Sequence, residues 1–93
     1  MRTIRRTAAF KRDYRRERKG RFAGIVDADL ARIVAELSED RPLAPRHRDH
    51  ALVGQWKDHR DCHVRPDLVL IYRKPDVEHL DLVRLGSHSE LGL

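Results

Sequence analysis

The apolar residues of this chain change their spacing near its middle, and that change restricts the folds that its 93 residues can adopt. Between Val26 and Leu37 they recur at the i, i+4, i+7, i+8 and i+11 positions that form one face of a helix. After Gln55 the pattern becomes extended, and two X-Pro-Asp turns divide it into three strand-like runs. The runs cover residues 56–64, 68–73 and 77–86, and the turns cover residues 65–67 and 74–76. The second half therefore predicts a three-stranded antiparallel meander.

The first part of the chain predicts a short strand and a further helix. Residues 2–6 are extended in character, and the Thr7 hydroxyl can cap a helix that runs to about Lys19. A break with two glycines separates this helix from the one that begins near Val26. The two helices are therefore expected to form a hairpin.

The order of elements predicts the fold class. Two prolines end the second helix and open a loop from about Ser38 to Gln55, and residues 87–91 can form a short helical turn. The order strand, helix, helix, strand, strand, strand predicts a small two-layer α+β domain. The helical hairpin is expected to cover one face of a mostly antiparallel sheet and to leave the other face open. The length corresponds to one domain, residues 1–93.

Positive charge is concentrated at the N-terminus. The chain has 20 Lys+Arg against 15 Asp+Glu, and residues 1–21 hold ten of the basic residues and only two of the acidic ones. Such a block favours an anionic partner, either nucleic acid or an acidic protein segment, or it is a solvated helix face. The residues expected to contact phosphates are Arg5, Lys11, Arg12, Arg15 and Arg16.

The sequence gives no indication of a membrane span or of export. Its longest apolar run, residues 68–72, is far shorter than the roughly 20 residues of a membrane helix, and the basic N-terminus lacks the apolar stretch of a signal peptide. Cys62 is the only cysteine, so a disulfide is not expected. These features predict a soluble cytoplasmic protein.

All six histidines lie in the second half of the chain, among arginines and aspartates. Imidazole has an unperturbed pKa of about 6.5, so it can both accept and donate a proton near neutral pH. Several imidazoles beside arginines indicate acid–base chemistry on a phosphate. A zinc site is not expected, because His59 and His63 would stand about 13 Å apart in a strand that rises about 3.3 Å per residue.

Two segments of the second half resemble a known family. They are DHALVGQWKDHRDCHVRPDLVLIY at residues 49–72 and RLGSHSEL at residues 84–91. Their order of His, Gly-x-Trp, Arg-Asp-x-His-Val-x-Pro-Asp, Ile-Tyr and Arg-x-Gly-Ser-His resembles that of the YafQ-type toxins of the RelE/ParE superfamily. The layout is similar over nearly the whole chain, whereas the helical residues before Pro42 match only in character.

The resemblance implies the toxin of a type II toxin–antitoxin system. Toxins of this type are messenger RNA endonucleases that cleave in the ribosomal A site, inhibit translation and are neutralised by a cognate antitoxin. The implied partners are therefore the ribosome, mRNA and an antitoxin, with a heterotetramer as the expected complex. The basic first helix is expected to dock on ribosomal RNA. The resemblance implies no cofactor and no metal.

By the same resemblance, the functional residues of the family fall on His50, His63, Asp67, Arg84 and His88. Metal-free RNA cleavage uses the ribose 2′-hydroxyl as nucleophile, with a base to remove its proton, a cation on the phosphorane and an acid for the departing 5′-oxygen. His88 is expected to be the general acid, and His50 or His63 the base. Asp67 either orients an imidazole or acts as base, and Arg84 is expected to bind the scissile phosphate.

Two positions depart from the family's pattern. Leu68 stands where relatives carry tryptophan, and Gly92 lies in a C-terminal end that commonly holds phenylalanine, so substrate gripping or cleavage preference is expected to differ. Trp56 is interpreted as a core anchor. His47 and His79 match no functional position and are expected on the surface.

Two other functions stay open on the sequence alone. A ParE-like toxin of the same fold would bind and inhibit a protein target such as gyrase, and it would not need the histidines. A small basic nucleic-acid-binding module would bind phosphates through its N-terminal basic residues, and its binding would fall steeply with salt.

Overall fold

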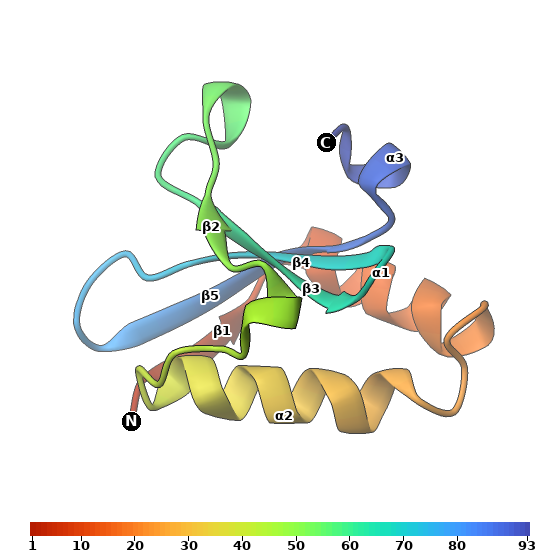
Figure 1. The fold of residues 1–93 in the computed structure, drawn as a ribbon, viewed down its shortest axis with the longest axis horizontal. Helices are drawn as coiled ribbons and strands as arrows, with labels where there is room; N and C mark the ends of the chain where they lie inside the picture. The colour runs from red at the N-terminus through yellow and green to blue at the C-terminus, as the bar shows by residue number, and fades with distance from the viewer.

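The computed structural model describes all 93 residues, which form one sheet with two long helices on one face (Figure 1). The strands are β1 (Thr3–Arg6), β2 (His50–Ala51), β3 (Arg60–Arg65), β4 (Leu68–Arg73) and β5 (His79–Gly86). The helices are α1 (Ala8–Lys19), α2 (Val26–Ser38) and α3 (His88–Leu91), with short 3-10 turns η1 (Pro45–His47) and η2 (Gly54–Trp56). The predicted α+β class, helical hairpin and meander are confirmed.

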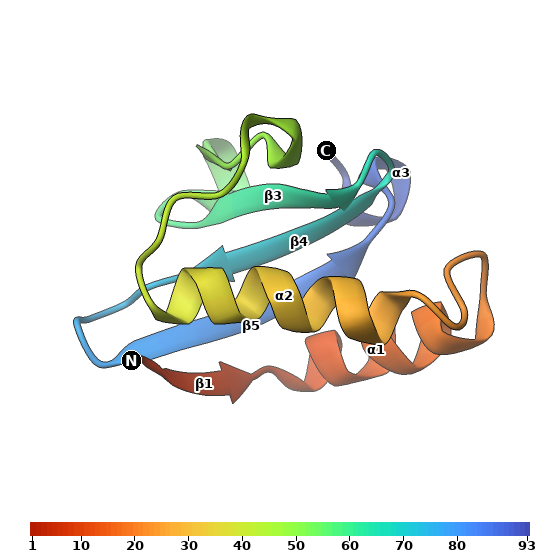
Figure 2. The same cartoon turned by 60° about the horizontal axis from the view of Figure 1, so that its bottom comes forward.

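The sheet has the strand order β1-β5-β4-β3-β2. β1 runs parallel to β5, and the other pairs are antiparallel. α2 lies across the sheet, and α1 lies along its β5 side (Figure 2). The first and last strands of the chain are thus neighbours, and the strands of the meander follow one another outward from β5.

The main core lies between the helices and the sheet. Phe10 of α1, Leu37 of α2 and Leu70 and Tyr72 of β4 are among its buried side chains. α1 begins as predicted, because the Thr7 hydroxyl accepts a hydrogen bond from the Phe10 backbone N–H at 2.9 Å. None of the helices combines the length and the apolar character needed to cross a bilayer.

Two predicted strands begin later than their patterns indicated. The first meander strand begins at Arg60 rather than at residue 56, because Gly54 opens a 3-10 turn with φ of 69°. The last begins at His79 rather than at residue 77. There the Asp76 carboxylate accepts hydrogen bonds from the backbone N–H groups of Glu78 and His79, at 2.8 and 2.9 Å, and holds these residues in a turn.

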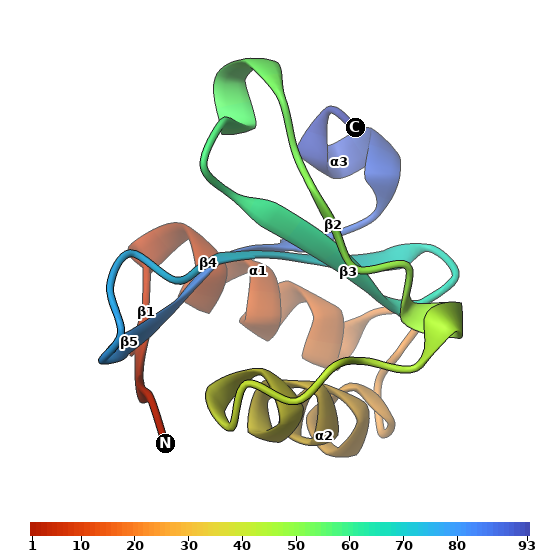
Figure 3. The same ribbon diagram turned by 60° about the vertical axis from the view of Figure 1, so that its left-hand side comes forward.

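The sheet face opposite the long helices is not open as predicted. The two-residue strand β2, which falls in the expected loop, pairs with β3 and carries an arm that includes η2 over this face (Figure 3). Trp56 from the arm and Leu91 from α3 pack with Val69 and Ile71 of β4 in a second apolar cluster. The arm and α3 therefore flank the exposed part of this face.

Candidate active site

Strand alternation decides which side chains of β3 can face a substrate. Cys62 and Val64 are buried in the main core, so Asp61 and His63, which alternate with them, point to the face opposite the long helices. Burial also raises the pKa of the Cys62 thiol, which fits a structural side chain. The face of β3 opposite the long helices is thus the floor of the candidate site.

His88 is brought to this face by the short helix α3. The Ser87 hydroxyl accepts a hydrogen bond from the Glu90 backbone N–H at 3.1 Å, and the Glu90 carboxylate accepts one from the Ser87 N–H at 2.8 Å. This reciprocal cap fixes the first residue of the helix. The imidazoles of His63 and His88 consequently meet edge to face, with ring centroids 4.9 Å apart.

Asp67 binds His88 through two hydrogen bonds. Its carboxylate lies 2.8 Å from Nδ1 of the ring and accepts a second hydrogen bond from the His88 backbone N–H at 3.1 Å. These bonds hold the pKa of Asp67 below its ordinary value, so the group is a carboxylate and Nδ1 carries a proton. The Nε2 edge of His88 is left for another molecule, and the side chain is 40% exposed.

His50 lies opposite Asp61 in the pairing of β2 with β3. Its Nδ1 donates a hydrogen bond to the Arg48 carbonyl at 2.7 Å, because a carbonyl can only accept. A neutral His50 therefore carries its lone pair on Nε2, the tautomer that can remove a proton. Nδ1 also lies 3.2 Å from an Asp61 carboxylate oxygen, although the hydrogen bond goes to the carbonyl.

Asp61 is a buried carboxylate that the sequence reasoning missed. It is only 3% exposed, and its Oδ1 has no hydrogen-bond partner. Burial raises the pKa of Asp61, while the nearby charges of His50, His63 and His88 act in the opposite direction. The signal that could have found Asp61 is its position two residues before His63, which puts both on one face of a strand.

The environment of His63 favours its neutral form. Burial is the largest cause that lowers the pKa of His63, and the charges of His88, Arg48 and His50 add to it, whereas Asp61 opposes them. Neutral imidazole is the form that can accept a proton. His63, His50 and His88 thus lie within electrostatic reach of one another on one face of the molecule.

Arg84 does not join the histidines in this structure. Its Nε donates to the buried Asp13 carboxylate at 2.7 Å, and Nη2 donates to the same carboxylate at 3.3 Å. Arg84 is paired in register with Ile71, which is in turn opposite Asp61. It therefore belongs to the same cross-strand row as the site but directs its guanidinium to α1. The expected phosphate contact of Arg84 stays a prediction.

The surface prediction was wrong for His47. This residue is 8% exposed, and its Nδ1 donates to the His63 carbonyl at 2.7 Å, so η1 supports the strand that carries the site. His79 is half-buried and bonds through Nδ1 to Asp76 at 2.9 Å. Trp56 packs in the second apolar cluster and meets the His59 ring at 5.5 Å.

The two departures from the family's pattern lie in different surroundings. Leu68 is 1% exposed and belongs to the main core, so it offers no surface to a base. Gly92 ends α3 with φ of 72°, a left-handed conformation that glycine adopts without strain. Residue 68, where relatives carry an aromatic side chain, therefore has a packing role in this chain.

The five basic residues expected to contact phosphates divide into two groups. Arg5 pairs with Asp81 at 2.7 Å, and Arg16 pairs with Asp13 at 3.0 Å and with Glu17 and Glu90 at 3.0 and 3.3 Å. The members without an ion pair, all exposed on α1, are Lys11, Arg12 and Arg15. These three are the part of the basic helix most available to an anionic partner.

No group of three or more His, Cys, Asp or Glu side chains is arranged to hold a metal ion. The chemical groups at hand are instead an imidazole paired with a carboxylate, a second imidazole biased toward its neutral form and a third with a free Nε2. Such a set can move protons at two positions of one substrate.

Comparison with known proteins identifies the family. Residues 2–92 match a family model described as the bacterial toxin of type II toxin–antitoxin system, YafQ. The mRNA interferase toxin YafQ of Escherichia coli (strain K12) is 46% identical over 50 residues, 54% of this chain and 53% of that protein. The chain thus spans about half the length of the curated relatives that it matches.

Solved structures are similar over the whole chain. A metal-bound toxin from Helicobacter pylori is 43% identical, with a TM-score of 0.87 over 98% of this chain and 99% of that one. YafQ in the E. coli DinJ-YafQ complex is 32% identical, with a TM-score of 0.83 over 98% of both chains. On the family model and these structures, the chain belongs to the YafQ family of bacterial type II toxin–antitoxin toxins.

Proposed function

We propose that this chain is an endoribonuclease that cleaves mRNA in the ribosomal A site and thereby inhibits translation. The observation that carries the proposal is the contact between His63 and His88, with Asp67 bound to the second ring. His63 is biased to its neutral form, whereas His88 faces a carboxylate. The two rings therefore differ in the way that a base and an acid must differ. The E. coli relative named as an mRNA interferase supports the substrate class.

The reaction is a transesterification within the RNA. A base removes the proton of a ribose 2′-hydroxyl, and the 2′-oxygen forms a bond to phosphorus. The bond from phosphorus to the 5′-oxygen breaks, and His88, in its imidazolium form with Nδ1–H bound to Asp67, gives the proton of Nε2 to that oxygen. The products are a 2′,3′-cyclic phosphate and a 5′-hydroxyl, and no step needs a metal ion. Each well-placed acid or base contributes roughly 10²- to 10⁴-fold.

His63 is the first candidate for the base, and His50 is the second. His63 is favoured by its lowered pKa and its contact with the acid, and His50 by its free Nε2. Of the two roles considered for Asp67, orientation of His88 is the one that its hydrogen bonds favour. Arg84 would bind the scissile phosphate once RNA draws its guanidinium toward the site.

The proposed partners are the ribosome, mRNA and a cognate antitoxin. The antitoxin is proposed because a similar toxin forms the DinJ-YafQ complex, and a heterotetramer is its proposed form. The exposed basic residues of α1 would dock on ribosomal RNA.

Induced expression in bacteria tests the proposal. The wild-type chain should arrest growth, and His88→Ala should abolish the arrest without loss of fold, because it removes the acid. The His79→Ala variant is the control, since that histidine pairs only with the exposed Asp76 at the far end of β5. Full arrest by a folded His88→Ala variant would contradict the nuclease and favour a toxin that acts by binding alone.

A further inference from the structure

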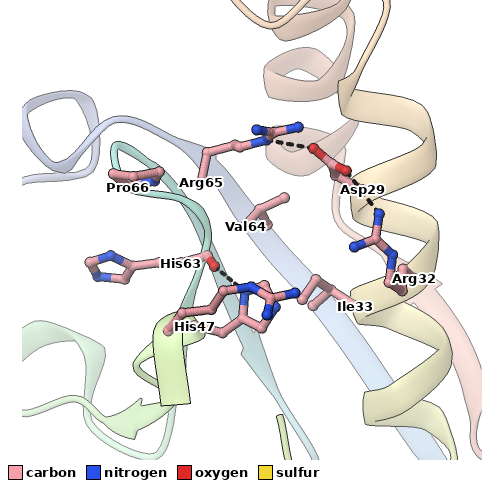
Figure 4. A pocket seen from close by; sticks show the side chains of 9 residues that line it. Asp29, Arg32, Ile33, His47, His63, Val64, Arg65 and Pro66 are labelled. Carbon is pink, nitrogen blue, oxygen red and sulfur yellow. Dashed lines mark hydrogen bonds and ion pairs between the residues drawn. The ribbon is translucent and has the colours of Figure 1, made fainter. Parts of the chain in front are cut away.

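A basic pocket lies beside the histidine cluster, between α2, η1 and the turn that joins β3 to β4 (Figure 4). Its volume is about 330 Å³. Sites for small ligands begin at about this size, so the pocket suits a single nucleotide unit rather than a folded RNA.

The charge of the pocket is positive. Three arginines line it, against a single carboxylate, Asp29, which two of them share. Arg65 pairs with Asp29 at 2.6 Å and Arg32 at 3.1 Å. Arg46 is exposed and has no carboxylate partner. An anion can therefore bind guanidinium groups of the pocket without disrupting the fold.

The arginines are the part of the pocket that a base can reach. Its two hydrophobic lining residues, Ile33 of α2 and Val64 of β3, are 2% and 6% exposed and belong to the main core, so they close the floor of the pocket. Planar guanidinium groups fit both parts of a nucleotide. The base stacks on a guanidinium, and the phosphate accepts hydrogen bonds from the arginines.

His63 connects the pocket to the cluster. Figure 4 shows its ring pointing away from the pair of Arg65 and Asp29, while its carbonyl oxygen accepts the hydrogen bond from the buried His47. The same ring meets His88 on the other side. The neighbouring residue Arg48 lies close enough for its charge to act on the His63 ring. A strand of RNA bound at the cluster would therefore pass next to the pocket.

We propose that this pocket binds the nucleotide next to the scissile linkage of a single-stranded RNA substrate. Arg32 and Arg46 would bind its phosphate, and its base would stack on a guanidinium of the pocket. The inference rests on the proposed cleavage of RNA at the histidine cluster. Single-stranded RNA fits better than an acidic protein segment because the pocket is small, shares His63 with the reacting groups and offers planar cations on which a base can stack.

Binding of an uncleavable RNA tests the inference apart from catalysis. The probe is a fluorescent hexanucleotide pool of random sequence with a 2′-O-methyl group on every ribose, so no 2′-hydroxyl can attack. Its affinity is measured by anisotropy over a range of salt concentrations. The Arg32→Gln/Arg46→Gln variant should bind more weakly, with a slope of log affinity against log salt that is shallower by about 0.7 for each lost contact.

The matched control is Arg18→Gln/Arg41→Gln, which removes the same charge at exposed residues outside the pocket. It should retain the wild-type slope. On ribosomes carrying mRNA, the pocket variant should show a raised KM and a nearly unchanged kcat, because neither arginine touches the reacting atoms. Thermal unfolding of each variant checks that the fold is retained.

Three results would contradict the proposed role of the pocket. The first is that the wild-type chain does not bind the RNA, and the second is that the pocket variant and the control bind it with equal affinity. The third is that the pocket variant loses affinity only for mRNA-free ribosomes or for an antitoxin.

The proposed nuclease activity and the proposed pocket can be contradicted independently. If no variant cleaves RNA but binding follows the arginines of the pocket, the nuclease is contradicted and the pocket stands.

Discussion

Burial, a second imidazole and a buried carboxylate together set the protonation state of His63. Burial and His88 act to lower its pKa, Asp61 acts to raise it, and the lowering prevails. The histidines of the site were found from the sequence through their resemblance to a family's motif. Asp61 was missed because the effect of a carboxylate on a ring depends on burial and distance, neither of which spacing reveals. The contact of Arg84 with Asp13 was missed for the same reason, since 71 residues separate them.

The first prediction concerns the titration of His63. NMR of the ring protons should give a midpoint below the ordinary histidine value of about 6.5. Replacing His88 by Gln should raise the midpoint, because a charge that lowers the pKa of His63 is removed. Asp61→Asn should lower the midpoint of His63 below that of the wild-type chain, because a carboxylate that raises the pKa of His63 is removed. An unshifted midpoint in all three proteins would contradict the coupling of these groups.

The same shift gives a pH dependence for activity and stability. A base with a lowered pKa stays neutral below pH 6.5, so cleavage should persist there and decline only as His63 itself gains a proton. Since the folded state disfavours the charged ring, stability is also lost as the pH falls from about 6.5 through the folded pKa. The effect on activity is measured as the rate of mRNA cleavage on programmed ribosomes between pH 5 and 8. A reference substrate whose own response does not change over this pH range is the control. A cleavage rate that already declines on the acid side at or above pH 6.5 would contradict the lowered pKa of the base.

At the scale of elements, α1 is tied to the edge of β5 by one buried carboxylate. Asp13 accepts hydrogen bonds from the Leu85 backbone N–H at 3.0 Å, from Arg84 and from Arg16. The helices, the meander and the capped turn of α3 follow from periodicity and turn chemistry. β2 does not, because a strand of two residues shows no period and exists through its pairing with β3.

The second prediction is that Asp13→Ala destabilises the fold by about 3 kcal/mol, since the Leu85 N–H and the Arg84 guanidinium lose their acceptor and Arg16 loses one of its partners. Burial alone would raise the pKa of Asp13, but the hydrogen bonds of Arg84 and Leu85 and the nearby arginine charges lower it. The stabilisation is therefore present above the ordinary aspartate pKa of 3.8 and is lost as the pH falls through the lower folded value.

Urea unfolding of wild-type, Asp13→Ala and Glu36→Ala chains measures this loss. Glu36 is the control, because it makes only a surface pair with Arg41 at 3.2 Å. Equal destabilisation by the two variants would show that the buried carboxylate has no special part in holding α1 to β5.

At the scale of the whole molecule, the basic helix and the histidine cluster occupy different faces. α1 packs with α2 on one side of the sheet, and the cluster lies on the other, flanked by α3 and the arm of β2 and η2 (Figures 1 and 3). Composition located the positive charge at the N-terminus but could not separate paired from unpaired residues. The structure leaves Lys11, Arg12 and Arg15 without ion pairs and binds Arg5 and Arg16 to carboxylates.

The third prediction tests α1 as the surface that docks on the ribosome. Arg12→Glu and Arg15→Glu should each weaken binding to ribosomes in cosedimentation at moderate salt, because a favourable phosphate contact becomes a repulsive one. Arg41→Glu places the same charge change on an exposed residue after α2 and should have little effect. Equal affinities for all three variants would remove α1 from the docking surface.

The most direct test of the account is to map the 5′ ends of transcripts on translating ribosomes, with and without this protein. The proposed acid–base cleavage predicts new ends at codons in the A site when the wild-type chain is present. The same ends should be absent when a folded His88→Ala variant replaces it. A pattern of 5′ ends that is the same with the wild-type chain as without any added protein would contradict the assignment of the histidine cluster as a nuclease site.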